Sequence, residues 1–232
     1  MARWHAIFSI SDEVPIRWQR LLMHFLYPWN PMVVHLPSKG LFNWFLDLLF
    51  YILDVLFLPE LYKALYVAFK PNIRKLNTEE IHIAHSVFYD LLDTDKIIID
   101  EQSRRVSKKL GVAYVTFGLI HCWKSLNRDV FIHELVHVFQ YQLFGSVYIA
   151  HALRAQMSHP SYDYGGLEGL KTAMTQKKPF LSFNFEQQAS IIEHFYNLRN
   201  RCTDEEMKSH WFPYVHYWNE LLSLKKAFSP NK

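Results

Sequence analysis

The sequence predicts a mainly α-helical fold of the α+β class, with one small β-sheet. Half of its 232 residues are hydrophobic, 16% are aromatic and only seven are glycine. This composition favours a compact, helix-rich chain over a disordered one. Several segments carry apolar residues at helical spacing behind a capping residue, and two short runs are rich in β-branched and aromatic residues. The length suffices for one large domain or two small ones with a buried core.

Charge and cysteine content exclude some classes of protein. The formal net charge is +3 without any run of lysine or arginine, so nothing supports nucleic-acid binding. The two cysteines, Cys122 and Cys202, have neither metal-finger spacing nor a disulfide-framework pattern, and we interpret them as thiols. The first residues, MARWHAIFSISDEV, lack the apolar core of a secretory signal. We therefore expect a cytoplasmic location in the producing cell.

The N-terminal region is predicted to be helical, hydrophobic and aromatic. Residues 1–40 are interrupted by proline, which allows only short helical pieces. Residues 41–69 are the most hydrophobic part of the chain, but Asp47 and Asp54 interrupt the run of about 20 apolar residues that a spanning helix needs. One polar stripe at helical spacing contains Asn43, Asp47, Tyr51 and Asp54. We expect a helix half-buried in its own protein, with peripheral membrane contact through residues 41–69 as the alternative.

The plausible domain boundary lies near Pro71–Leu76. It separates a hydrophobic N-terminal region, residues 1–75, from a domain of residues 76–232 that ends in a C-terminal helix. That domain opens with a helix in LNTEEIHIAHSVFYDLL, where Asn77 and Glu80 have the spacing of a capping box. Two strands are predicted next, in KIIID (96–100) and GVAYVTFGLI (111–120), because β-branched and aromatic residues dominate both runs.

Helices account for most of the remaining chain. One is predicted through FIHELVHVFQYQLF, with Asn127 or Asp129 near its start and Gly145 at its end. SVYIAHALRAQM is a further helix, and HPSYDYGG is a loop rich in turn-forming residues. In SFNFEQQASIIEHFYNL, Asn184 and Gln187 again have capping-box spacing. The last segment, DEEMKSHWFPYVHYWNELLSL, is predicted to be an aromatic helix broken at Pro213.

His133, Glu134 and His137 form a His-Glu-x-x-His motif within the predicted helix. Residues four apart lie on one side of a helix, about 6 Å apart, so two imidazoles can bind one zinc ion. Glu134 is rotated by about 100° from His133 and can take a proton from a water on the open side of the metal. A strand shortly before the motif suits a cleft whose edge strand pairs with an extended substrate. The alternative interpretation is a pair of histidines satisfied within the core.

A third protein ligand must come from elsewhere in the chain. The metzincin pattern requires Gly at position 140 and His at position 143, and this chain has Gln140 and Leu143, so that class is excluded. The residues that remain as candidates are Glu168, Glu186, Glu193, His151 and His159. Glu186 opens a predicted helix, where an acidic side chain is favoured by the helix dipole whether or not it binds metal.

Four segments, FIHELVHVFQYQLFG, ALRAQ, YDYGGL and FNFEQQASII, resemble the zincin-like metallopeptidase domain that is encoded beside spike proteins of bacterial type VI secretion and other contractile injection systems. The resemblance covers about residues 76–200. It implies a zincin-like core in which His133, His137 and Glu186 bind Zn²⁺ and Glu134 activates water against a peptide bond. A protein or peptide substrate, a secretion-spike partner and export without a signal peptide are also what it implies.

The chain departs from this family at one informative position. Many gluzincins carry an aspartate one turn after the ligand glutamate, and this chain has Ser190 there, so we expect the residues that orient the histidines to come from another segment. Tyr164 is a candidate hydroxyl donor to an oxyanion, although a packing role is the favoured interpretation.

Two other functions are weighed against the enzyme. One is a non-catalytic, zinc-stapled adaptor or loading module of a secretion spike, and the other is a membrane-active effector that uses residues 41–69.

Overall fold

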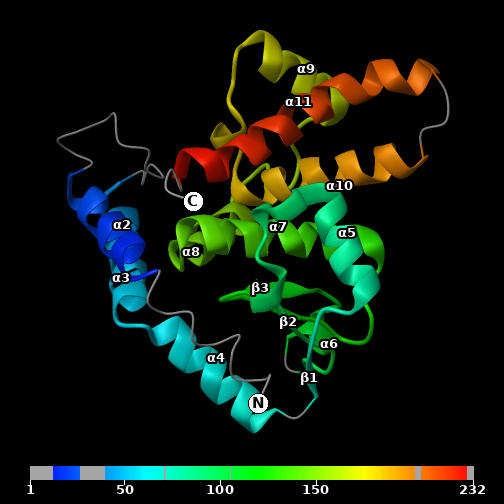
Figure 1. Ribbon diagram of the computed structural model, residues 1–232. Coiled ribbons are helices and arrows are strands. Elements are labelled where there is room, and N and C mark those ends of the chain that lie inside the picture. The colour runs from blue at the N-terminus through cyan, green and yellow to red at the C-terminus, as the bar shows by residue number, and fades with distance from the viewer. Residues whose placement is uncertain (1–12, 27–39, 71, 105, 202–204, 229–232) are drawn as a thin grey trace.

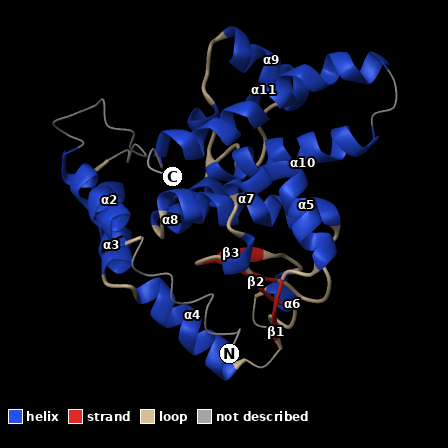
Figure 2. Ribbon diagram, in the orientation of Figure 1, coloured by secondary structure: helices blue, strands red, loops and turns tan. Residues whose placement is uncertain are grey.

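The computed structural model describes residues 13–26, 40–70, 72–104, 106–201 and 205–228 (Figure 1). Cys122 is a buried free thiol, whereas Cys202 lies outside the described residues. The fold is mainly helical with one small sheet, as the sequence predicts (Figure 2). Its α-helices are α2 (Val14–Leu26), α3 (Leu41–Val55), α4 (Leu58–Phe69), α5 (Thr78–Phe88), α6 (Ser107–Leu110), α7 (Arg128–Phe144), α8 (Val147–Met157), α9 (Gly166–Thr175), α10 (Phe185–Arg201) and α11 (Glu205–Phe228). Its strands are β1 (Ile73–Lys75), β2 (Ile98–Asp100), β3 (Tyr114–Thr116) and β4 (Leu119–His121).

The sheet has the order β1-β2-β4-β3, in which β2 and β4 are parallel and the other pairs are antiparallel. The prediction of one strand over residues 111–120 is wrong, because this run folds back on itself as the β3–β4 hairpin. Phe117 and Gly118, between the two strands, both have positive φ, as tight hairpin turns require. Strand β1 was not predicted, since three residues are too short to give an alternating pattern.

Helix α7 lies between the sheet and α10, in the middle of the molecule (Figure 1). It packs against α5, α8, α10, β3 and β4, and it is buried on most sides. The predicted ends are confirmed: the Asn127 side chain accepts from the Val130 N–H at 2.8 Å, and Gly145 is the C-cap. The capping boxes predicted for α5 (Asn77 with Glu80) and α10 (Asn184 with Gln187) are present as well.

The C-terminal part differs from the prediction in two ways. Helix α11 continues through Pro213, so the predicted break is wrong. Its aromatic side chains are held by α10 and the loop before it: Tyr217 is fully buried, and Trp218 stacks on Phe195 with 4.6 Å between ring centroids. This packing compensates for the hydrogen bond that proline removes from the helix. Helix α9, which has Glu168 in its first turn, is not predicted by the sequence, which indicates only the loop HPSYDYGG before it.

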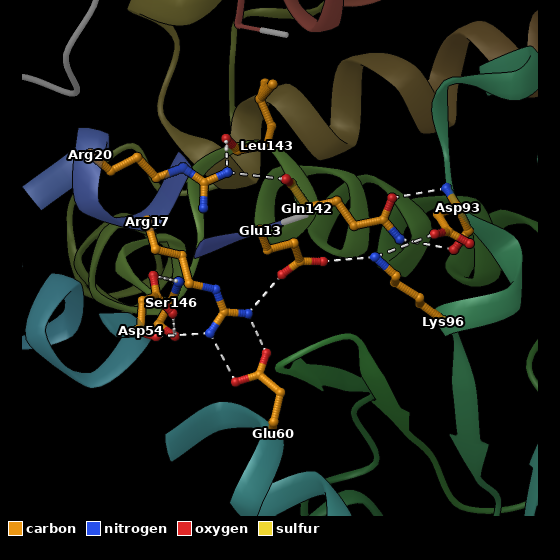
Figure 3. Close-up of polar contacts among 10 residues, drawn as sticks. All are labelled: Glu13, Arg17, Arg20, Asp54, Glu60, Asp93, Lys96, Gln142, Leu143 and Ser146. Carbon is orange, nitrogen blue, oxygen red and sulfur yellow. Dashed lines mark hydrogen bonds and ion pairs between the residues drawn. The ribbon is translucent and has the colours of Figure 1, made fainter. Parts of the chain in front are cut away.

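Helices α2 and α3 lie beside α8 and the end of α7, and α4 continues from them toward the sheet, against which its Tyr66 and Val67 pack (Figure 1). The residues buried in α2 and α3 are Arg17, His24, Asp47, Tyr51 and Asp54, so the predicted polar stripe of α3 faces the protein. Arg20 donates to the Leu143 carbonyl at the end of α7 (2.8 Å), and Asp54 accepts from the Ser146 N–H at the start of α8 (2.8 Å) (Figure 3). Both charges suit the helix ends that they contact.

Candidate metal centre

Helix α7 presents the two motif histidines on one side, a single turn apart. The ring centroids of His133 and His137 are 5.0 Å apart, and both side chains are mostly buried. The helix is fixed in the core by Ile132, Leu135 and Val136, none of which is exposed to solvent. The sheet and α10 that surround α7 therefore set the direction in which the imidazoles point.

Glu186, in the first turn of α10, brings a fully buried carboxylate to both imidazoles. Its Oε2 atom lies 3.1 Å from His133 Nε2 and 3.3 Å from His137 Nε2. Ligand atoms around a tetrahedral zinc ion with bonds of about 2.0–2.1 Å are about 3.3 Å apart. One atom from each of the three side chains falls within 4.8 Å of the other two. The three groups are thus spaced for a single ion.

Two side chains, one of them the candidate ligand Glu193, bind the imidazole nitrogens that face away from Glu186. His133 Nδ1 donates to Glu193 Oε2 at 3.0 Å, and His137 Nδ1 donates to Gln140 Oε1 at 2.8 Å. With Nδ1 engaged in this way, Nε2 of each ring is the atom directed at Glu186. The expectation that such residues come from another segment is wrong for His133, because Glu193 lies on α10 two turns after Glu186.

A chain of amide groups fixes the start of α10 against α7. Gln140 Nε2 donates to the Phe185 carbonyl (3.2 Å) and to Gln188 Oε1 (3.0 Å). Gln188 Nε2 in turn donates to the Phe183 carbonyl (2.8 Å). The other oxygen of Glu186 accepts from Gln156 Nε2 of α8 at 2.8 Å. Three helices therefore determine where the Glu186 carboxylate lies.

The ion pairs dominate the electrostatics of this cluster. Burial opposes the charged form of His133, but hydrogen bonds to Glu186 and Glu193 outweigh it and raise the pKa of His133 to about 10. Burial likewise opposes ionisation of Glu186, yet the two histidines hold the pKa of Glu186 well below its usual range. A cation that bound here would displace the proton from His133, as is general for metal sites.

Glu134 is the motif residue that has an unsatisfied buried oxygen atom. It is buried beside the two histidines, and its Oε2 atom makes no hydrogen bond to any described residue. Burial raises the pKa of Glu134, whereas the charges of His137 and His133 act in the opposite direction. An unpaired buried carboxylate is costly and rare in folded proteins, and it fits a place where a water or a metal complex completes the site.

The other candidate ligands lie elsewhere. Glu168 is exposed on α9 and pairs with Lys171. His151 contacts Asp47 and stacks on Phe185, and His159 is exposed in the loop after α8. Among the described residues, His133, His137 and Glu186 make up the one group of three suited to a metal ion.

Two tyrosines of the loop between α8 and α9 have different surroundings. Tyr164 is buried, and its hydroxyl contacts His194 Nδ1 and the Tyr214 hydroxyl, as the packing interpretation expects. Tyr162 is 46% exposed, and its ring centroid is 5.9 Å from that of His133. Burial and the charges of Glu186 and Glu134 raise the pKa of Tyr162 to about 12, so its phenol stays protonated at neutral pH. The sequence does not distinguish the two tyrosines.

Strand β3 lies at one edge of the sheet, next to α7. The Tyr148 hydroxyl donates to the Val115 carbonyl of β3 at 2.5 Å. The ring centroid of Tyr148 is 6.4 Å from that of His137. A single buried tyrosine thus connects the edge strand with the imidazole pair.

Neither a protein-family model, nor a curated protein sequence, nor a solved structure matches this chain.

Proposed function

We propose that this chain is a zinc-dependent metallopeptidase of the gluzincin type. The observation that carries the proposal is the convergence of His133, His137 and Glu186 beside the unpaired carboxylate of Glu134. Two imidazoles and one carboxylate are a donor set of catalytic zinc sites, which leave a position open for water. Zinc bound by these residues supplies a Lewis acid that polarises a carbonyl and lowers the pKa of water to about 7.

The side chains have separate tasks in this proposal. Glu134 accepts a proton from the attacking water and passes it to the amide nitrogen that leaves. Tyr162 donates a hydrogen bond to the oxyanion that forms on the substrate carbonyl, because its phenol is protonated, partly exposed and close to His133. Glu193 and Gln140 keep the imidazoles directed at the ion.

A protein or peptide is the proposed substrate. Among the described residues β3 is an edge strand near α7, and an extended peptide can add to such an edge by main-chain hydrogen bonds to the backbone groups other than the Val115 carbonyl, which Tyr148 occupies. The resemblance of the motif segments to zincin-like domains of contractile secretion systems supports the same substrate class. A role as a secretion-system effector or processing protease, with a secretion-spike protein as partner, belongs to this proposal.

The direct test is the isosteric substitution Glu134→Gln. We expect it to lower cleavage of a proteome-derived peptide library by about 10²- to 10⁴-fold, because the general base is lost. Its zinc content should equal that of the unaltered chain, because Glu134 is not a ligand. Glu168→Gln is the matched control, since the same chemical change is made at an exposed carboxylate on α9.

Full cleavage by Glu134→Gln would contradict the assignment of the base. An intact chain that binds zinc but cleaves no member of the library would instead favour the zinc-stapled adaptor or loading module of a secretion spike.

A further inference from the structure

The outward surfaces of α2, α3 and α4 are almost free of polar groups. Every exposed side chain between residues 40 and 70 is aliphatic or aromatic. The largest include Phe42, Phe45, Leu49 and Phe69, of which Phe42 is 78% and Phe69 is 80% exposed. On α2, within residues 13–26, Gln19 is the only polar residue that is exposed. Exposed apolar surface on this scale marks an interaction site.

The charged groups of the same helices bind other groups of the protein. Asp47 is fully buried and pairs with Arg154 of α8 at 2.7 Å. Arg17 is also buried and binds Glu13 and Glu60, while Arg20 and Asp54 contact the ends of α7 and α8 (Figure 3). Lys63 of α4 binds the Lys96 carbonyl, and Lys70, the residue after α4, binds Asp100. A surface helix of a water-soluble protein buries its apolar side and exposes its polar side, and these helices do the reverse.

Helix α3 is too short to span a bilayer. Within the described residues no single helix is long and apolar enough to cross a membrane. Helices α3 and α4 together have the length and apolar composition of a span, but they are bent by 65° relative to each other. The 15 residues of α3 extend about 22 Å, short of the hydrocarbon core of about 30 Å. Two bent helices of this kind can enter a membrane from one side without crossing it.

The absence of exposed charged side chains from residues 40–70 also favours a lipid bilayer over a protein as the binding partner. Protein interfaces have a polar, solvent-accessible rim and several hydrogen bonds. The surface of residues 40–70 offers no exposed charged or amide side chain for such contacts. The hydrocarbon core of a bilayer offers no polar partners and needs none. It also excludes charged side chains, and the charged side chains of these helices bind the protein instead.

We propose that the outward face of α2, α3 and α4 inserts into one leaflet of a lipid bilayer as a monotopic anchor. The anchor is rigidly joined to the candidate metal centre. Asp47 of α3 binds Arg154 of α8, and Gln156 of the same helix binds Glu186. The centre is therefore held at a fixed height over the lipid. The anchor itself does not depend on the proposed chemistry.

Flotation of the full chain with vesicles tests this proposal. We expect the chain to float with phosphatidylcholine alone and with a phosphatidylcholine–phosphatidylglycerol mixture, and to stay bound in high salt, because apolar burial is not screened. The triple variant Phe42→Glu, Phe45→Glu, Leu49→Glu should reduce partitioning by about a hundredfold or more, because three charges would enter hydrocarbon. All three side chains point outward, so folding by circular dichroism should be unchanged.

A matched control places the same charges on exposed apolar residues outside the anchor, in the variant Leu110→Glu, Val112→Glu, Phe212→Glu. It should float like the unaltered chain. Three results would overturn the proposal: a chain that stays at the bottom with both vesicle types, a helix triple variant that floats equally well, or binding that needs phosphatidylglycerol and is released by salt. If the chain does not float and light scattering finds a dimer that the helix triple variant dissociates, the face binds a second copy instead.

Discussion

Each imidazole of the candidate metal centre is held by a side chain outside the motif. Glu193 binds His133, and Gln140 binds His137. The spacing of the motif predicts which histidines converge, because four residues make about one helical turn. It does not predict these partners. Residues 186, 190 and 193 share one face of α10, and only the packing of α10 on α7 brings both Glu186 and Glu193 to His133.

Substitution of Tyr162 and Tyr164 distinguishes a catalytic tyrosine from a structural one. We expect Tyr162→Phe to lower kcat by about a hundredfold with little change in KM or zinc content, because the hydroxyl would act on the transition state alone. Tyr164→Phe should leave kcat unchanged and lower the free energy of unfolding by about 1 kcal/mol, through the lost contacts to His194 and Tyr214. Steady-state kinetics and urea unfolding of both variants measure this. A reversed pattern would assign the oxyanion contact to Tyr164.

At the element scale, the turn between α7 and α8 ends the helix that carries the motif. Gly145 has φ of 80° there, and the Asp54 carboxylate and Arg20 guanidinium close over it. Asn127 and Gly145 predict both ends of α7 from the sequence, because capping depends only on residues that are close in the chain. The β3–β4 turn, helix α9 and the continuity of α11 through Pro213 were not predicted. They depend on packing between elements that local signals do not contain.

Substitution of this glycine tests how tightly the turn between α7 and α8 is packed. A Cβ atom at Gly145 would lie 2.2 Å from Asp54 Oδ2 and 2.9 Å from Arg20 Nη1. We expect Gly145→Ala to lower the free energy of unfolding by about 3 kcal/mol, from backbone strain and steric overlap together. Gly111→Ala is the control, because Gly111 also has positive φ but nothing within 4 Å, so it should cost about 1 kcal/mol. Equal losses in urea titrations would show that this turn is loosely packed.

In the whole molecule, α2 and α3 lie beside α8 and the end of α7, with their apolar side chains turned outward (Figure 1). The sequence contains the polar stripe of α3 but does not show that the stripe faces the protein. Asp47 and Asp54 find their partners, Arg154 and Ser146, about a hundred residues away in the chain. The division into residues 1–75 and 76–232 stays a prediction, with β1 paired to β2 and α3 packed on α8.

The metal content of the purified, never-chelated chain tests the central claim most directly. Inductively coupled plasma mass spectrometry should find one zinc per chain, retained in Glu134→Gln and lost in His137→Ala, because only the latter removes a ligand. The absence of any stoichiometric transition metal from the unaltered chain would contradict the claim. His133, His137 and Glu186 would then be a buried ion-pair cluster without a metal.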